Sequence, residues 1–452
     1  MQTLIRDTTV ITVDGQRTVF YPGAVVVRGN TITDIGPSDV VVSRTTRPDR
    51  VVDGRGKVVL PGFVSAHNHV GYAVFRGRAE DIGHAPTQRL YMPMNPVISR
   101  QEREAVGRLA IAELLRGGMT TILEMEEDAA LFAPFIERVG MRAAMGVMVH
   151  DVDIDRLVAG DVVFDAAVRD RQLGQAIGFA EAWHGKAEGR ITTMMTANGL
   201  ASSSPALLRA LRDAADRLSL RLSIHIGTGE EEQVRDLHGI GSFQYAREHG
   251  FLAEDVVAVH CYRASDADVQ AMADAGAHLA HCPFMNAFRG AIAPVQDLRA
   301  RGVNVGLGID NYFSDYFDVM RSCIAVARIR AHDPEIMPAN EVLELATLNA
   351  ARALGLDTIT GSLEVGKRAD LQIVDMRRYG LTPTNDALRT LVYHAHAKDV
   401  ETVMVDGRMV VLEGRVVGED EQALLDAAAL ASDTAWERFV ARYGGYAVPR
   451  PA

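Results

Sequence analysis

The chain has 452 residues, of which 48% are hydrophobic and 23% are charged, as in a well-packed globular protein. Its net charge of −12 argues against nucleic acid or an anionic membrane surface as a partner. The cysteines Cys261, Cys282 and Cys323 are odd in number and form no close pair, so we expect no disulfide framework and a reducing compartment.

The first residues and the hydrophobic runs predict no membrane association. Residues 1–16 lack a long apolar core with a basic flank, so we expect no signal peptide. No run of about eighteen apolar residues is present that would span a bilayer. The sequence therefore predicts a cytoplasmic protein.

Two segments at the ends of the chain predict β-structure. Residues 1–59 contain short runs such as TTVITVDG and GAVVVRGNTITDIG that alternate with Asp, Gly and Asn turns, a hairpin-rich pattern. The same pattern returns in residues 360–418, in ADLQIVDM and ETVMVDGRMVVLEG. We expect these segments to pair as one small, discontinuous β-sandwich domain, and residues 419–452 to form a C-terminal helix and tail.

Residues 60–359 alternate apolar strands with helical segments. The candidate strands are, in chain order, GFVSAH, TTILEM, RAAMGVM, ITTMMTA, RLSIHI, VVAVH, AHLAH and VNVGLGI. Apolar strands that alternate with helices predict a parallel sheet covered on both faces. Eight such units fit an α/β fold of the (β/α)8 TIM-barrel type, for which about 250 residues is typical. A doubly wound open sheet is the alternative.

Polar residues recur at the carboxyl ends of these strands. They are His67 and His69 on the first strand, His225 on the fifth, His260 on the sixth, His281 on the seventh and Asp310 on the eighth. The spacing of the first two directs both imidazoles to one face of a strand. Because the carboxyl ends of barrel strands form the active face, we expect these side chains to converge.

Imidazoles with one carboxylate suit Zn²⁺ or Fe²⁺ and leave a position for water. Such an ion lowers the pKa of its water ligand to near neutral and makes the water a nucleophile. Asp310 is then a candidate ligand and base, and His260 a candidate to polarise the water or hold the substrate. For His260 and His281 a hydrogen-bonded core position is the open alternative.

With these motifs the chain resembles the amidohydrolase superfamily, in the branch of cytosine, guanine and S-adenosylhomocysteine deaminases, triazine hydrolases and N-aryl urea or thiocarbamate hydrolases. The resemblance runs from VVLPGFVSAHNH through FRGRAED, SIHIGTGEEE, VAVHCY, AHCPFMNA and GVNVGLGID to GSLEVGKRADLQIVD. It implies that one divalent metal per chain is held by His67, His69, His225 and Asp310, with His260 as the catalytic histidine. Zinc is favoured over iron or cobalt.

The resemblance also bears on a second metal and on assembly. Binuclear relatives carry a bridging lysine after the fourth strand, whereas this chain reads ITTMMTANGLASSS there, so a second metal is not expected. Barrels of this branch are commonly dimers or larger, which implies a homo-oligomer.

The same resemblance implies substrate-binding residues. His281 and Asn286, in AHCPFMN, match a segment that lines the pocket, and Arg76 and Asp81, in FRGRAED, match a loop that often closes over substrate. Aromatic residues near the expected mouth, among them Phe284 and Tyr312, suit a flat, largely uncharged small molecule. Few cationic residues in these loops argue against a phosphorylated substrate. For each, a structural turn or packing on the barrel rim is the open alternative.

One departure from the branch decides the expected reaction. Its deaminases carry a proton-shuttling Glu three residues after the fifth-strand histidine, where this chain has Thr228. The following acids, Glu230 to Glu232, match the start of the next helix. Losing a positioned acid typically costs about 10²–10⁴-fold in rate, whereas a metal alone can polarise a carbonyl.

We therefore expect hydrolysis of a non-peptide C–N bond at an amide, urea or carbamate-type carbonyl, with Thr228 near the substrate. The alternative is a deaminase or dechlorinase of an aminopyrimidine, purine or triazine that uses Glu230 or water. A catalytically inactive structural relative is the third hypothesis, which the complete set of metal residues disfavours.

Overall fold

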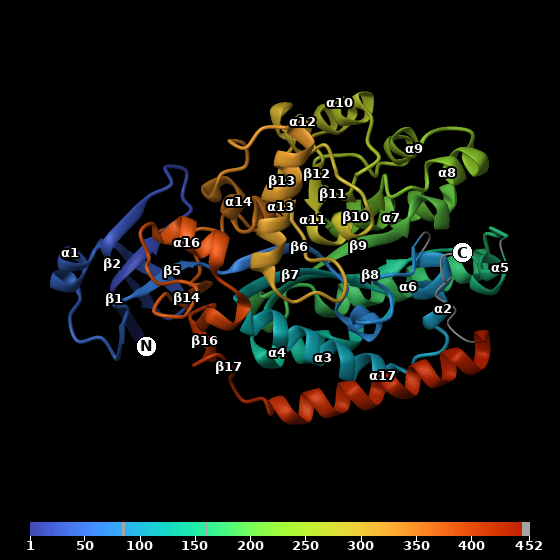
Figure 1. Cartoon of the computed structure of the whole chain (residues 1–452). Coiled ribbons are helices and arrows are strands. Elements are labelled where there is room, and N and C mark those ends of the chain that lie inside the picture. The colour runs from blue at the N-terminus through green and yellow to red at the C-terminus, as the bar shows by residue number, and fades with distance from the viewer. Residues whose placement is uncertain (84–85, 160, 445–452) are drawn as a thin grey trace.

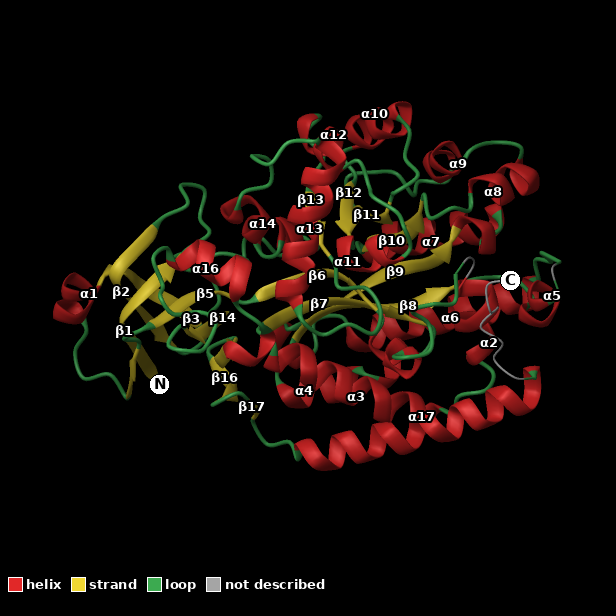
Figure 2. Ribbon diagram, viewed as in Figure 1, coloured by secondary structure: helices red, strands yellow, loops and turns green. Residues whose placement is uncertain are grey.

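The computed structural model describes residues 1–83, 86–159 and 161–444 (Figure 1). Two β-sheets, one of eight strands and one of nine, organise the described chain. The larger body, with helices around a central sheet, and the smaller β region lie side by side (Figure 2).

The eight-stranded sheet is made of the predicted apolar runs. Its strands are β6 (Phe63–Asn68), β7 (Met119–Glu126), β8 (Arg142–Val149), β9 (Ile191–Gly199), β10 (Arg221–Ile226), β11 (Val256–His260), β12 (His278–His281) and β13 (Val305–Leu307). Consecutive strands pair in parallel. Parallel strands buried on both faces need near-continuous apolar sequence, which is why these runs were recognisable.

The first and last strands of this sheet meet and close it. A parallel bridge joins Asn68 to Asp310. The Asp310 amide donates to the His67 carbonyl (3.1 Å), and the His69 amide donates to the Asp310 carbonyl (3.0 Å). The predicted (β/α)8 barrel is thereby confirmed over the open-sheet alternative, and closure brings residues at both ends of the barrel sequence together.

Helices follow the strands and cover the barrel. They include α3 (Arg100–Arg116), α4 (Ala133–Val139), α6 (Ala166–Trp183), α7 (Pro205–Leu218), α8 (Glu231–His238), α9 (Ser242–Glu248), α10 (Asp266–Ala275), α11 (Pro283–Phe288), α12 (Val295–Ala300), α13 (Tyr316–Ala331), α14 (Ala339–Leu345) and α15 (Leu348–Ala353). Local sequence sets several starts: Ser99 and Glu102 form a capping box at α3, and Ser265 and Asp268 form another at α10.

The two ends of the chain form the nine-stranded sheet. Its strands are β1 (Gln2–Ile11), β2 (Val19–Arg28), β3 (Thr31–Pro37), β4 (Arg50–Asp53), β5 (Lys57–Pro61), β14 (Leu371–Asp375), β15 (Val400–Val405), β16 (Arg408–Leu412) and β17 (Arg415–Val416). The antiparallel pairing of β5 with β14 joins the N-terminal segment to the C-terminal one. The expected separate β domain built from both ends is therefore present.

The C-terminal helix α17 (Glu421–Tyr443) lies along α3 on the outside of the barrel (Figure 1). Its Trp436 is buried, and the indole Nε1 donates to the carbonyl of Val74 (2.8 Å). The tail expected beyond the helix, residues 445–452, lies outside the described residues. No helix in the described part of the chain is long and apolar enough to cross a membrane.

Candidate active site

The polar residues predicted at the strand ends converge at one rim of the barrel. The Nε2 atom of His225 lies 3.2 Å from Nε2 of His67 and 3.2 Å from Nε2 of His69. Asp310 Oδ1 lies 3.5 Å from His67 Nε2, and Asp310 Oδ2 lies 3.7 Å from His260 Nε2. These atoms come from β6, the residue that follows it, β10, β11 and Asp310, which bridges to β6, so closure of the barrel assembles them.

This arrangement fits a single divalent metal. Nitrogen ligands about 2.0–2.1 Å from a tetrahedral ion are roughly 3.3 Å apart, close to the observed 3.2 Å between imidazole nitrogens. The Nδ1 atoms of His69 and His225 contact the backbone carbonyls of Met125 and Asn198. Those contacts place the ring proton on Nδ1 and leave Nε2 free to bind a metal. Asp310 Oδ2 has no hydrogen-bond partner among the described residues.

The protonation states suit ligands near neutral pH. Burial, followed by the neighbouring His67, lowers the pKa of His225 to about 3. Burial also holds the pKa of His69 and that of His260 well below the usual value. Burial opposes ionisation of Asp310, but His260 and His67 outweigh it and hold the pKa of that carboxyl well below its usual range. Neutral imidazoles and an ionised carboxylate are the forms that bind cations.

Two of these residues adopt an uncommon backbone conformation. His260 has φ 73° and Asp310 has φ 72°, both in the left-handed region. Such a conformation costs a non-glycine residue roughly 1–3 kcal/mol and persists where the surrounding fold imposes it. In both cases the strained residue carries a side chain of the converging group.

Strand β7 holds the loop that follows the first-strand histidines, η1 (Val70–Phe75). The Glu124 carboxylate accepts the amide of Val70 (3.1 Å), and the Glu126 carboxylate accepts the amide of Gly71. A Cβ at position 71 would lie 2.5 Å from Glu126 Oε2, so a larger residue there would push this carboxylate away from the amide. Together with the Met125 carbonyl on His69, three consecutive residues of β7 position three consecutive residues of the loop.

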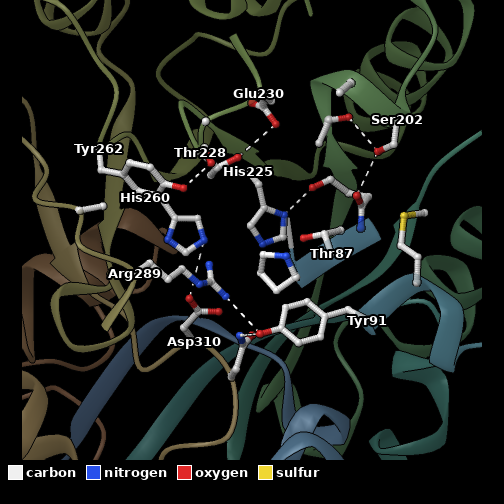
Figure 3. Close-up of a pocket in the computed structure, with 18 of the residues that line it drawn as sticks. Thr87, Tyr91, Ser202, His225, Thr228, Glu230, His260, Tyr262, Arg289 and Asp310 are labelled. Carbon is white, nitrogen blue, oxygen red and sulfur yellow. Dashed lines mark hydrogen bonds and ion pairs between the residues drawn. The ribbon is translucent and has the colours of Figure 1, made fainter. Parts of the chain in front are cut away.

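A cavity of about 420 Å³ opens over the converging residues (Figure 3). Its described lining includes His69, His225, His260, Asp310, Tyr91, Thr228, Glu230, Tyr262 and Arg289. Small-molecule sites commonly occupy about 300–1,000 Å³. The cavity is therefore of a size for one small organic molecule next to the candidate metal ligands.

Thr228, the residue at the expected shuttle position, lines this cavity. Its hydroxyl donates to Glu230 Oε2 (3.2 Å), and its carbonyl accepts a hydrogen bond from the Tyr262 hydroxyl. Thr228 therefore contacts a carboxyl group of the cavity wall (Figure 3).

The other residues expected to bind substrate lie elsewhere. His281, 1% exposed, lines a separate cavity between the barrel and helices α12 and α13. Its side chain thus faces the outer helical layer, because successive strand residues point to opposite faces. Asn286 lies in α11, is fully buried and is absent from the described lining of the main cavity.

Arg76 and Asp81 do not line the cavity among the described residues either. The Arg76 guanidinium pairs with the Glu113 carboxylate at 2.7 and 3.1 Å, and its Nε donates to the Tyr312 carbonyl (3.1 Å). The arginine therefore ties two loops to α3, and Asp81 is exposed to solvent. In this structure Arg76 makes structural contacts and Asp81 is a surface charge, and the binding of substrate by either residue stays a prediction.

The two aromatic residues pack on the rim. The Phe284 ring lies 4.5 Å from that of Phe313 and 5.1 Å from that of Phe288. Tyr312, 5% exposed, lies 5.0 Å from Phe313. Neither contributes to the described lining of the main cavity, because each is held in this aromatic cluster.

Glu230 occupies the cavity although its sequence position matches a helix start. It is the N-cap residue of α8, as expected, but the turn before it contains Gly227 with φ 65° and Gly229 with φ 94°. These left-handed residues turn the chain back so that the Glu230 side chain lines the cavity. Burial, with Glu231 adding to it, raises the pKa of Glu230 to about 8. The two glycines that flank Thr228 were the available sequence signal.

Sequence reasoning also missed Arg289, the residue that follows α11. Its side chain lines the cavity, and Nη2 donates to the Tyr91 hydroxyl (3.3 Å). Arg289 lies three residues after AHCPFMN, the segment that the resemblance assigned to the pocket, and nothing in the local pattern indicated the direction of its side chain.

Comparison with known proteins gives a consistent result. The profile of the amidohydrolase family matches residues 58–410. A 5-methylthioadenosine/S-adenosylhomocysteine deaminase of Moorella thermoacetica is 32% identical over 434 residues, 93% of this chain and 96% of that protein. A 5′-deoxyadenosine deaminase of Methanosarcina mazei is 32% identical over 438 residues, 95% of this chain and 97% of that one.

Among solved structures, a zinc-bound adenosine deaminase from Xanthomonas campestris superposes with a TM-score of 0.87. The identity is 26%, and the match covers 96% of this chain and 98% of the other. The barrel, the small β domain and the terminal helix thus lie within one shared architecture.

Proposed function

Because the chain belongs to the amidohydrolase family, whose members hydrolyse carbon–nitrogen bonds other than peptide bonds, we propose that it deaminates an amino-substituted nitrogen heterocycle. The observation that carries this proposal is the Glu230 carboxyl in the wall of the cavity, next to Thr228. Similarity to deaminases of adenosine derivatives over more than nine-tenths of the chain supports it.

Glu230 supplies the proton-exchanging carboxyl group that Thr228 lacks. Hydrolytic deamination protonates a ring nitrogen as water attacks and then protonates the departing amine, so it needs a carboxyl group that gives up and regains a proton. With a pKa of about 8, Glu230 is protonated at neutral pH. The Thr228 hydroxyl holds Oε2, while Oε1 has no hydrogen-bond partner among the described residues and is the oxygen we assign to carry the proton.

The remaining residues divide the other tasks. His67, His69, His225 and Asp310 would hold the metal, which when bound supplies an acidified water as nucleophile. Asp310 Oδ2 and His260 Nε2, 3.7 Å apart, form the pair that accepts a proton during attack. Glu230 donates its proton to the ring nitrogen and regains one for the leaving ammonia.

Hydrolysis at a urea, amide or carbamate carbonyl is the second candidate. Thr228 at the usual shuttle position favours it, because a carbonyl needs no ring-nitrogen protonation. The argument for carbonyl hydrolysis assumed that the pocket has no carboxyl group to shuttle protons. Glu230 in the cavity wall provides such a group, so we place this candidate second.

A screen of the zinc-reconstituted full chain tests the proposal. Ammonia release is measured with aminopyrimidines, aminopurines, adenosine derivatives and aminotriazines, and release of the organic amine is measured with N-substituted aryl ureas, carbamates and amides. We expect ammonia from at least one amino-heterocycle. Turnover confined to the ureas, carbamates or amides would overturn the proposal in favour of the second candidate.

We also propose that the enzyme works in the cytoplasm, which three buried cysteines without disulfides support. Assembly into a homo-oligomer stays a prediction from the resemblance, to be tested by light scattering of the purified chain.

A further inference from the structure

A guanidinium group without a carboxylate partner lies in the cavity wall. Arg289 makes no ion pair with any described residue, and of its guanidinium nitrogens only Nη2 has hydrogen-bond partners among those residues, Tyr91 and Asn311. Nε and Nη1 are left without one in the described part of the chain. Figure 3 shows the group beside Asp310, with His260 and Tyr91 around it.

Asn311 connects this guanidinium to the metal-binding aspartate. With its amide oriented to satisfy both neighbours, Asn311 donates to Asp310 Oδ1 (2.7 Å) and accepts from Arg289 Nη2 (3.2 Å) and from the Tyr91 hydroxyl (3.2 Å). Asn311 and Tyr91 are 6% and 4% exposed, so this connection is buried and ordered. Arg289 is therefore held in a set position relative to the reacting centre.

The Asp310 carboxylate attracts this cation, but no direct ion pair joins the two groups among the described residues. Asp310 and Glu230 are the carboxyl-bearing residues among the described lining of the cavity. The Asp310 carboxylate faces the imidazoles and Asn311, and Glu230 is uncharged at neutral pH. Arg289 is half-buried, and its N–H groups without a protein partner are available to an oxygen acceptor of a molecule in the cavity.

We propose that Arg289 selects heterocycles that carry an oxo group on the ring, its free N–H groups donating to that oxygen. This rests on the proposed deamination and names its substrate class: an amino-substituted lactam, as opposed to an amino-heterocycle that lacks a ring oxygen. Because Arg289 is linked through Asn311 to Asp310, the oxygen it meets belongs to the reacting ring and not to a distant substituent.

Matched substrate pairs test the assignment. Guanine is compared with 2-aminopurine, and cytosine with 4-aminopyrimidine, because each pair keeps the amino group and differs in the ring oxygen. We expect the wild-type chain to prefer the oxo member of at least one pair in kcat/KM by roughly 10- to 100-fold, the effect of a hydrogen bond to a charged group. Arg289→Gln should abolish that preference, mainly through KM, and Arg289→Lys should retain part of it.

Arg263→Gln is the matched control, because Arg263 also lines the cavity but its guanidinium lies over the Tyr262 ring at 5.9 Å. It should leave the preference for the oxo member intact. An Arg289→Gln variant that keeps the wild-type preference, or slows both members of a pair equally, overturns the proposal. The proposal is also overturned if Arg289→Gln instead changes the ratio of kcat/KM for S-adenosylhomocysteine to that for 5′-methylthioadenosine. These two compounds have the same ring and differ only in the tail.

Calorimetric binding separates this proposal from the proposed function. Guanine, 2-aminopurine, cytosine and 4-aminopyrimidine are titrated into the zinc-loaded wild type and Arg289→Gln, with thermal unfolding as a check on folding. If the oxo compounds bind the wild type but not Arg289→Gln, and no ammonia is released, deamination is refuted and the selection of oxo heterocycles by Arg289 is upheld. Equal binding by both proteins, or none, refutes the selection whatever the reaction.

Discussion

Thr228 and Glu230 lie next to each other in the cavity wall, and the threonine stands where the family resemblance leads us to expect a glutamate. We propose that Glu230, two residues further on, supplies the missing carboxyl group. The threonine hydroxyl donates to one carboxyl oxygen, so it orients the acid without taking part in proton transfer.

Glu230→Gln tests this division. We expect kcat on the best amino-heterocycle to fall by about 10²–10⁴-fold, because the amide keeps the shape of the side chain but cannot deliver a proton. Glu232→Gln, at an exposed position on α8, is the matched control and should stay within twofold to threefold of wild type, as is usual for surface changes (about ±0.5 kcal/mol). Ammonia release measures both. Equal rates in the two variants would remove Glu230 from the mechanism.

The dependence of kcat/KM on pH also tests the role of Glu230. In the proposed mechanism Glu230 is the proton donor, and its proton is present below a pKa of about 8 and lost as pH rises through that value. We therefore expect kcat/KM to decline above about pH 8 in the wild type and to lack that decline in Glu230→Gln. A profile that is level to pH 10 in the wild type would contradict the assignment.

We propose two tasks for the Asp310 carboxylate, metal ligand and proton acceptor. Asp310→Asn should reduce turnover to background, since the site loses an anionic ligand and a proton acceptor, while the far-ultraviolet circular dichroism stays unchanged. Zinc analysis of the purified variant accompanies the assay. Activity within tenfold of wild type would show that the carboxylate is neither ligand nor base.

At the scale of elements, β7 acts on the site without reaching the cavity. Glu124 and Glu126 are fully buried and accept the amides that follow His69. Arg103 of α3 lies 3.4 Å from Glu126 and compensates part of its charge. Burial still raises the pKa of Glu126 to about 7. Burying these two acids costs folding free energy. In return, their hydrogen bonds fix the orientation of His69.

Glu126→Ala tests that positioning role. We expect zinc affinity to fall by roughly 10- to 100-fold, as for other groups that orient metal ligands, because the η1 loop loses the acceptor at Gly71. Competition with a chromophoric chelator measures the affinity. Glu137→Ala, at an exposed position of α4, is the control. Unchanged zinc affinity in Glu126→Ala would reduce the role of Glu126 to packing.

At the scale of the whole molecule, α17 connects the end of the chain to the loop of the active site. Trp436 and Phe439 are each 4% exposed, and the Trp436 indole binds the Val74 carbonyl within η1. The barrel and the small β domain are joined as well, through Arg142 of β8 and Asp370, 2.7 Å apart and both buried. Segments distant in sequence thus support the rim that carries the ligands.

Trp436→Ala should destabilise the protein by about 3–5 kcal/mol, the usual cost of truncating a large buried aromatic side chain. Urea unfolding followed by circular dichroism measures it. Leu430→Ala on the same helix, 70% exposed, is the control and should change the free energy of unfolding by less than about 0.5 kcal/mol. Equal effects of the two changes would show that α17 does not stabilise the barrel through Trp436.

The sequence alone determined the barrel, the two-ended β domain and the convergence of His67, His69, His225, His260 and Asp310. Strands buried on both faces require apolar runs, and a parallel barrel sends every strand's carboxyl end to one rim, so residues at those ends must meet. Tertiary structure decided which loop side chains enter the cavity. The glycine turn directs Glu230 inward, the strand's alternation directs His281 outward, and Arg289 enters from the end of a short helix. Those directions depend on backbone dihedrals and packing that residue spacing does not encode.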